Sequence, residues 1–427
     1  MNRYEETLSH LSPVWMPYTH IVSEKAEGCW VYDISGEKYL DFTCGIGVTN
    51  TGHCHPAVVK AIQEQAARFI HAQMNLVKHK PIIELIDELQ TIVPEQIDCF
   101  FFTNSGAEAI EGAIKLARHA TKRTNIIVFQ GSFHGRTIAT MSLTASKTIY
   151  RVGYQPLMAG VFVAPYPYAY RYGWDEETTS RWCLEELEFL LLSQTAPEET
   201  AAILIKPVLG EGGYVVPPRS FMQGLRKICD QHGILLICDE VQAGFGRTGK
   251  WFSFQHFDIV PDIMTVAKGL ASGMPLAGVF SRKELMEKWV PGSHGGTYGG
   301  NAVAAAAAVA TIRAMKSEKM LENAVERGAQ LKRGLQHLQE EFPVIGDVRG
   351  LGLMIGSEFR TSDRKPDKKT AKDVVHACLD KKLMLLTCGT WDNTIRWIPP
   401  LIVSKEEIDL ALSIFHDSLR EVIPKFS

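Results

Sequence analysis

Short, continuously apolar runs alternate with helix-forming segments through the middle of this 427-residue chain, and that alternation is its most constraining feature. Each run is bounded by Gly, Pro or polar residues, as the buried strands of a parallel sheet are. Segments 107–120 and 220–233 have helical patterns. The sequence therefore predicts an α/β fold with a mainly parallel sheet. The runs expected to be strands are 99–104, 125–131, 201–208, 233–240 and 275–281.

The character of the chain changes after about residue 312. A charge-rich helical stretch there gives way to short strands and a final helix, as in a smaller α+β unit. Residues 28–48 alternate like a hairpin with its turn at Ile34–Gly36, and we expect them beside that small unit. The predicted division is an N-terminal segment packing with the small domain (1–57), a large domain (58–312) and a C-terminal small domain (313–427).

Composition excludes several classes of protein. With 45 basic and 48 acidic side chains the net charge is −3, which argues against coating nucleic acid or a membrane surface. No apolar stretch reaches the length of a membrane span, and no signal peptide is visible. The nine cysteines form no C-x-x-C pair, and several lie in apolar runs, so we expect reduced thiols and a cytoplasmic location.

Two motifs invite functional interpretations that we set aside. His53-Cys54-His55 has no further ligand cluster at recognisable spacing, so no metal site is predicted. Gly244 to Lys250 is nearly a P-loop, but Trp251 stands where a magnesium-binding Ser or Thr is needed. The chain is therefore not expected to be a nucleotide triphosphatase.

A strand-to-helix junction around Ser105 has two interpretations. Ser105 and Glu108 have capping-box spacing, which by itself favours a capped helix. The alternative is a phosphate cup, since glycine allows close approach and free N–H groups at a helix start attract anions. Glycine-rich segments 131–137 and 294–301 are suited to the same sheet edge, or are simply loops.

Titratable groups follow two predicted strands. Asp239 and Glu240 come after five apolar residues, at the edge of an open sheet where ligands bind. One of them can cap the following turn, but two acids at this edge favour function. Lys268 ends another apolar stretch and is either a lysine reaching to solvent or an amine that forms a Schiff base, its pKa lowered by partial burial.

The order of these motifs resembles the class III (ω-amino acid) family of pyridoxal-phosphate aminotransferases, fold type I. Within that family the 4-aminobutyrate aminotransferases are the most similar subgroup. The resemblance implies a large domain with a mainly parallel seven-stranded sheet, a smaller α+β domain, and pyridoxal 5'-phosphate as cofactor. The motifs that carry it are GEKYLDF, GHCHP, TNSGAEA, FHGRT, GEGG, DEVQAGFGRTG, AKG, HGGTYGGN and IRWIPPL.

The resemblance also implies catalytic roles. Lys268 would bind the cofactor covalently and later move the proton between the substrate carbon and the cofactor. Asp239 would pair with the ring nitrogen and keep it protonated, which makes the ring an electron sink. Gln242 would hydrogen-bond the phenolic oxygen, and Phe133 and Val241 would lie on the two faces of the ring.

Further cofactor contacts follow from the same motifs. Ser105, Gly106 and Ala107 would hold the phosphate at the helix start, and His134 would lie beside the cofactor. Thr297 would reach the phosphate bound by a neighbouring subunit. The resemblance therefore implies a homodimer, which can pair further into a tetramer.

The expected reaction transfers the amino group of an ω-amino acid, with 4-aminobutyrate favoured, to a 2-oxo acid, with 2-oxoglutarate favoured, by a ping-pong mechanism. By resemblance, Arg136 would hold the distal carboxylate of both substrates, and Arg396 the α-carboxylate of the oxo acid. Glu211 would neutralise Arg396 when the ω-amino acid is bound; the alternative is a fixed inter-domain salt bridge. One position departs from the family, which usually has Glu-Pro where this chain has Lys206-Pro207. The lysine either changes the preferred second carboxylate or alters a charge network without catalytic consequence.

Other functions remain open at this point. Acetylornithine or ornithine transamination would also use Arg136 and Glu211, whereas an amine–pyruvate transaminase would not need Arg136. A PLP-dependent epimerase or racemase would share Lys268 and Asp239 but would need no oxo acid. A cofactor-sensing regulator would need a DNA-binding domain, and the segment before Gly28 is too short and insufficiently basic for one.

Overall fold

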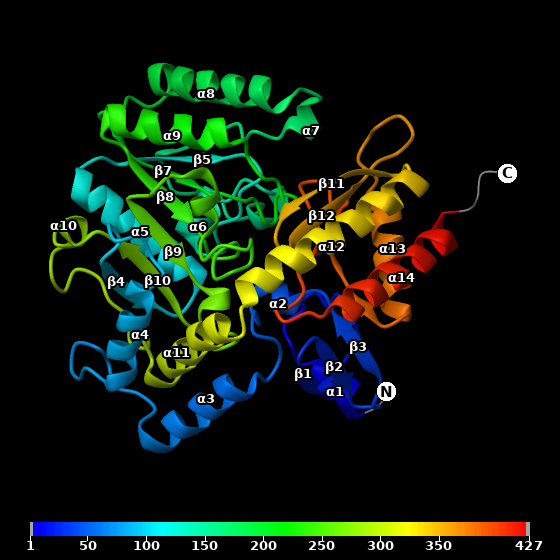
Figure 1. The fold of residues 1–427 in the computed structure, drawn as a ribbon. Coiled ribbons are helices and arrows are strands. Elements are labelled where there is room, and N and C mark those ends of the chain that lie inside the picture. The colour runs from blue at the N-terminus through cyan, green and yellow to red at the C-terminus, as the bar shows by residue number, and fades with distance from the viewer. Residues whose placement is uncertain (1–2, 424–427) are drawn as a thin grey trace.

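The computed structural model describes residues 3–423, arranged as a large half and a small half with an N-terminal segment beneath them (Figure 1). A seven-stranded sheet forms the centre of the large half, in the order β4-β10-β9-β8-β7-β5-β6. Strand β10 is antiparallel to both of its neighbours, and the other pairs are parallel. The strands are β4 (Cys99–Thr103), β5 (Asn125–Phe129), β6 (Val161–Ala164), β7 (Thr200–Ile205), β8 (Leu235–Asp239), β9 (Ile263–Val266) and β10 (Ala277–Ser281).

Both faces of this sheet are buried, which explains why its strands are continuous apolar runs. In β5, Ile126 and Val128 belong to one hydrophobic cluster, which includes Ile110 of α5 (Gly106–Thr121). Ile127 and Phe129 point the other way, into a cluster that includes residues of α8 (Glu176–Ser193) and α9 (Arg219–His232). All five predicted strands and both predicted helices are therefore confirmed. Strand β9 coincides with the apolar stretch that precedes Lys268, whereas the edge strand β6 is not predicted.

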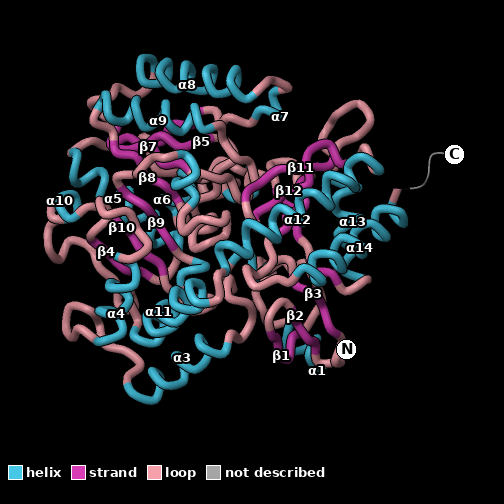
Figure 2. Tube along the Cα trace, viewed as in Figure 1, coloured by secondary structure: helices cyan, strands magenta, loops and turns pink. Residues whose placement is uncertain are grey.

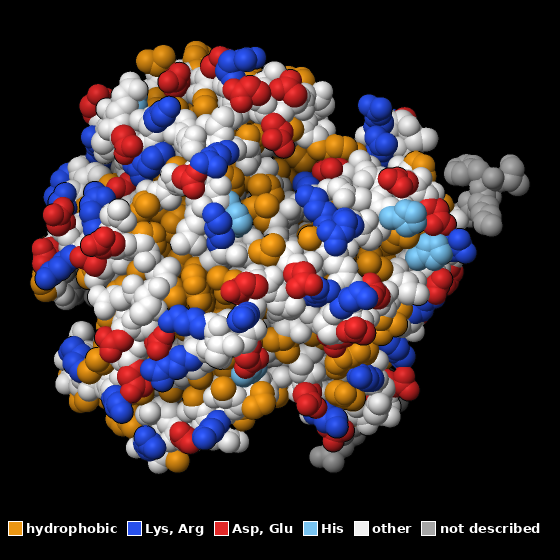
Figure 3. All heavy atoms as spheres, in the orientation of Figure 1, with side chains coloured by type: hydrophobic (Ala, Val, Ile, Leu, Met, Phe, Trp, Pro, Cys, Tyr) orange, Lys and Arg blue, Asp and Glu red, His pale blue; other side chains and the backbone are white. Residues whose placement is uncertain are grey.

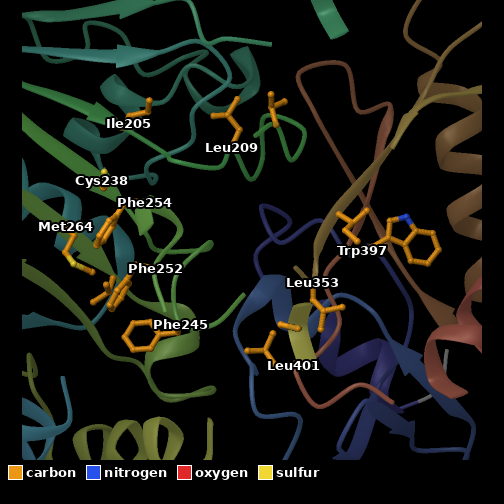
Figure 4. Close-up of a cluster of buried hydrophobic side chains, with 14 of the residues drawn as sticks. Ile205, Leu209, Cys238, Phe245, Phe252, Phe254, Met264, Leu353, Trp397 and Leu401 are labelled. Carbon is orange, nitrogen blue, oxygen red and sulfur yellow. The ribbon is translucent and has the colours of Figure 1, made fainter. Parts of the chain in front are cut away.

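The small half contains a four-stranded sheet in the order β11-β12-β15-β14. Its strands are β11 (Ile345–Leu351), β12 (Met354–Phe359), β14 (Leu386–Cys388) and β15 (Thr394–Trp397). Helices α12 (Met320–Glu341), α13 (Lys368–Asp380) and α14 (Lys405–Val422) accompany it, and α12 leads in from the large half (Figure 1). One continuous core joins the halves, because Phe245 and Phe252 belong to the same cluster as Leu353, Trp397 and Leu401 (Figure 4).

The N-terminal hairpin lies against the small half. Strands β1 (Ser23–Glu27), β2 (Trp30–Asp33) and β3 (Lys38–Asp41) are antiparallel, and β13 (Leu383–Met384) pairs with β3 in parallel. The turn closes where Gly36 N donates to Asp33 O. The other helices are α1 (Arg3–Leu8), α2 (Cys44–Gly47), α3 (Pro56–Arg68), α4 (Lys80–Gln90), α6 (Ile138–Leu143), α7 (Ala169–Tyr172), α10 (Lys283–Met286) and α11 (Ala302–Ser317).

Loops make up much of the region between the two halves (Figure 2), and most of the candidate site residues lie there or at its edge. On the face shown in Figure 3, basic and acidic side chains are interspersed, as the near-neutral net charge leads one to expect. No helix within residues 3–423 is both long and apolar enough to cross a membrane.

Candidate active site

The carboxyl ends of two neighbouring strands place a lysine and an aspartate side by side. Strands β7 and β8 are parallel with Ile205 opposite Cys238, so the next residues, Lys206 and Asp239, are adjacent across the pair. Lys206 Nζ donates to Asp239 Oδ2 at 2.7 Å, and both side chains are buried. At the position where the sequence departs from the family, Lys206 thus pairs with the aspartate rather than with the groups expected to bind substrate.

Asp239 has two further donors. His134 Nδ1 donates to the same Oδ2 atom at 2.7 Å, and Val241 N donates to Oδ1 at 3.1 Å. Burial by itself would raise the pKa of Asp239, but the charge of Lys206 and the His134 hydrogen bond outweigh it and hold that pKa well below its usual range. Burial lowers the pKa of His134, so the imidazole is neutral and the carboxylate is charged.

Lys268 and Gln242 meet at one backbone carbonyl. Lys268 Nζ donates to Ile46 O at 3.1 Å, and Gln242 Nε2 donates to the same oxygen at 3.3 Å. Burial, together with the charges of Lys206 and Arg396, lowers the pKa of Lys268 to about 7. Lys268 is therefore an amine that is substantially neutral near pH 7. Ile46, which supplies the shared carbonyl, has a φ of 69°, an unusual value for a β-branched residue.

The helix start around Ser105 fits both interpretations of its motif. Ser105 is the N-cap of α5 and its Oγ accepts from Glu108 N at 3.3 Å. The Glu108 side chain accepts from Asn104 N rather than from Ser105 N, so the capping box is only half formed. A Cβ on Gly106 would lie 2.9 Å from Val241 Cγ1, which brings this helix start against the Asp239 loop. The N–H groups of Gly106 and Ala107 begin the helix and have no intrahelical acceptor.

Glu211 links the large half to the small half. Its Oε2 lies 3.3 Å from Arg396 NH1, while its Oε1 accepts from Lys147 Nζ at 2.8 Å and from Tyr150 OH at 3.1 Å. Lys147 also pairs with Asp392. Burial would lower the pKa of Arg396, but Glu211 outweighs it and raises that pKa. Burial and the charge of Glu211 raise the pKa of Tyr150 to about 12.

The remaining basic group, Arg136, is exposed and lies beside two aromatic rings. Its guanidinium is 5.2 Å from the Tyr150 ring centre and 6.0 Å from that of Phe133, and those two rings are in edge contact. Within residues 3–423 no ion pair involves Arg136. It is therefore available to a carboxylate from solution.

Two residues singled out in the sequence, Glu240 and Thr297, lie away from the Asp239–Lys268 cluster or at the surface. Glu240 does not face the site: it is buried and accepts from Ser253 N, Ser253 Oγ and Phe254 N, so the expectation that both acids are functional is wrong for Glu240. The alternative, a capping acid, holds because its side chain closes the turn at Ser253. Burial raises the pKa of Glu240 to about 7. Thr297 is exposed, as a residue expected to reach another subunit must be.

The two histidines of the HCH motif contact two different carboxylates. His53 Nε2 lies 2.8 Å from Asp41, and His55 Nε2 lies 3.0 Å from Glu318. Among the described residues no group of three or more His, Cys, Asp or Glu side chains is arranged to hold a metal ion.

Sequence reasoning missed three contributors to this site. Ile46 acts through its backbone carbonyl, so its side-chain type carried no signal. Lys147 and Tyr150 lie far from Glu211 in the sequence and in a segment without a recognisable motif. Lys206 was noted in the sequence, but its pairing with Asp239 is visible only in the folded structure.

Comparison with known proteins gives consistent results. Residues 11–419 match the family described as class-III aminotransferases. The chain is 41% identical over 405 residues to a 5-aminovalerate aminotransferase of Pseudomonas aeruginosa, covering 94% of each chain. It is also 41% identical over 404 residues to the 4-aminobutyrate aminotransferase of Escherichia coli, again covering 94% of each. The solved structure of an omega transaminase of Pseudomonas jessenii in complex with PMP has a TM-score of 0.92 at 28% identity, covering 99% of this chain and 98% of that one.

Proposed function

The chain belongs to the class-III aminotransferase family, and we propose that it transfers the amino group of an ω-amino acid, with 4-aminobutyrate favoured, to 2-oxoglutarate. Enzymes of this family are transaminases that depend on pyridoxal 5'-phosphate. The observation that carries the substrate proposal is the Glu211–Arg396 pair, beside which Arg136 has no ion-pair partner in the described part of the chain. Such an arrangement distinguishes substrates by how many carboxylates they carry.

The residues present fit the cofactor. The start of α5 offers N–H donors to an anion. Gly106 stands there, where Val241 leaves no space for a side chain. His134 Nε2 is buried and has no hydrogen-bond partner within the described protein. Lys268 offers a neutral amine and Asp239 an ionised carboxylate. We assign the phosphate to Ser105, Gly106 and Ala107, the ring nitrogen to Asp239, the ring faces to Phe133 and Val241, and the phenolic oxygen to Gln242.

When bound, the cofactor withdraws electrons from the substrate carbon that carries the amino group, so that its proton can be removed. Lys268 then has two tasks: its neutral amine binds the cofactor, and afterwards it accepts and returns that proton. Its lowered pKa suits both, because a protonated amine is neither a nucleophile nor a base. Asp239 stays charged throughout, since Lys206 and His134 keep it ionised.

Charge pairing then selects the substrates. An ω-amino acid has one carboxylate, which Arg136 binds while Glu211 neutralises Arg396. A 2-oxo diacid brings a second carboxylate that binds Arg396, so Glu211 must first move away from Arg396. The anchor for Glu211 in that state is present, because its other oxygen is held by Lys147 and Tyr150. Leaving the buried Arg396 without any counter-charge would be costly, so a switch is favoured over an empty site.

We also propose that the working unit is a homodimer in which loop 294–301, exposed at residues 295–298, presents Thr297 to the neighbouring subunit's phosphate. The nine cysteines are all free, in keeping with a reducing cytoplasm. Subunit mass in solution, measured by light scattering, tests the assembly.

The first test of function is the visible spectrum of the purified holoenzyme mixed with 4-aminobutyrate in the absence of any oxo acid. Conversion of the yellow cofactor to its aminated form supports the proposed donor, and 2-oxoglutarate should restore the yellow form. Parallel samples with 5-aminovalerate, acetylornithine and a simple amine rank the donors. A yellow enzyme that responds only to acetylornithine, or only to the amine, would refute 4-aminobutyrate as donor. Lys268→Ala is the control, and it should not respond.

A further inference from the structure

Lys206 is the charged residue of this site that the proposed reaction does not use. It follows β7 directly, and its side chain is 8% exposed. Its ammonium donates to Asp239 Oδ2 at 2.7 Å. A lysine so little exposed needs a counter-ion, and Asp239 supplies it.

The distribution of donors on Asp239 shows what this pairing leaves for the cofactor. Oδ2 already accepts from both Lys206 and His134, whereas Oδ1 accepts only from Val241 N. A carboxylate oxygen has two acceptor sites, so Oδ1 can take one more donor. Thr265 is paired with Asp239 across the parallel strands β8 and β9. Its buried hydroxyl has no hydrogen-bond partner within the described protein. Within residues 3–423, Lys206 is thus the one permanent cation that contacts this carboxylate.

We propose that Lys206 is a positioning residue that shares the Asp239 carboxylate with the ring nitrogen of the cofactor and thereby weakens that nitrogen's hold on its proton. This rests on the proposed pairing of Asp239 with the ring. A carboxylate that already faces one cation presents less negative potential to a second, and the effect is large where water is excluded. The same positive charge acts on Lys268, where it helps to keep the amine neutral. Lys206 therefore acts on the ring nitrogen of the cofactor through the carboxylate of Asp239.

The test is the protonation state of the ring nitrogen in the holoenzyme, followed by NMR with ¹⁵N-labelled cofactor across the pH range in which the protein stays folded. Lys206→Met keeps the length of the side chain and removes its charge. We expect the ring nitrogen of this variant to hold its proton at least roughly tenfold more tightly, so that its titration moves up by about one pH unit or more. Lys206→Arg, which keeps the charge, should stay close to the wild type.

Two further variants complete the design. Lys369→Met removes a surface lysine that pairs with Asp373 at 2.6 Å, and it should leave the titration unchanged. Lys206→Glu places the family's usual acid here and serves if the methionine variant does not fold; its shift should have the same direction. Coinciding curves for wild type and Lys206→Met, or a wild-type nitrogen that stays protonated throughout, would overturn the proposal. If Lys268→Ala kept its turnover, the proposed function would fail instead, so the two failures are distinguishable.

Discussion

Removing the charge of Glu211 should separate the two half-reactions. Glu211→Gln preserves the size of the side chain but leaves Arg396, which is 5% exposed, without its carboxylate partner. Thr387 O still accepts from Arg396 NH2, so one hydrogen bond remains. An uncompensated buried charge costs about 3–5 kcal/mol, and we take the lower end, about 3 kcal/mol, because that bond persists.

This penalty applies only when the substrate does not supply its own α-carboxylate. Relative to 2-oxoglutarate, 4-aminobutyrate should therefore lose roughly 150-fold in kcat/KM in this variant, since 1.4 kcal/mol corresponds to a factor of ten. For 2-oxoglutarate, whose carboxylate neutralises Arg396, kcat/KM should fall by less than about threefold or rise, because Glu211 no longer has to be displaced.

Stopped-flow absorbance measures each half-reaction separately, starting from the yellow or the aminated enzyme. The matched control is Asp392→Asn, which removes the other carboxylate bound to Lys147 but leaves the contact between Glu211 and Arg396 intact. This control variant should change the rates of both half-reactions by similar factors. Equal losses in the two half-reactions of Glu211→Gln would refute the switch and identify the pair as a fixed salt bridge between the halves.

Four further outcomes are expected. Lys147→Met removes an anchor that holds Glu211 after its release, so the 2-oxoglutarate half-reaction should slow by roughly tenfold while the first half changes less, in the same stopped-flow assay. Gly106→Val places a side chain within 2.9 Å of Val241, so cofactor affinity should fall by at least roughly a hundredfold, as measured by equilibrium dialysis, and unchanged affinity would contradict the assigned phosphate cup. The pKa of Lys268 is about 7 and only its neutral form reacts with pyridoxal phosphate. The rate at which cofactor-free enzyme captures pyridoxal phosphate should therefore rise roughly tenfold per pH unit below pH 7 and level off above about pH 8. A rate independent of pH between 5 and 8 would contradict this. Glu240→Ala strands the buried N–H groups of Ser253 and Phe254, so urea unfolding should show a loss of about 3 kcal/mol, against little change for a surface acid such as Asp373→Ala.

Much of the site was predictable because its residues stand at chain positions with a local signature. Asp239 ends an apolar strand and Lys268 follows another by two residues, and the carboxyl ends of parallel strands meet at one edge of a sheet whatever the rest of the chain does. Ser105 begins a helix after a strand, so both its capping role and its exposed N–H groups follow from local sequence. The same reasoning could not separate Asp239 from Glu240, because consecutive residues at a strand end point to opposite sides and only packing decides which side is the site.

The pattern of residues along the chain is enough to predict five strands and two helices of the large half and the chemical groups at its sheet edge, since each depends on burial pattern and on residues near in the chain. Three pairings depend on the folded arrangement instead: Lys206 faces Asp239, the Ile46 carbonyl meets Lys268, and Glu211 is shared among Arg396, Lys147 and Tyr150. Those pairings join residues from different strands, loops and halves of the molecule. Electrostatic energy depends on distances of a few ångströms and on the exclusion of water, and neither is written in the order of residues along the chain.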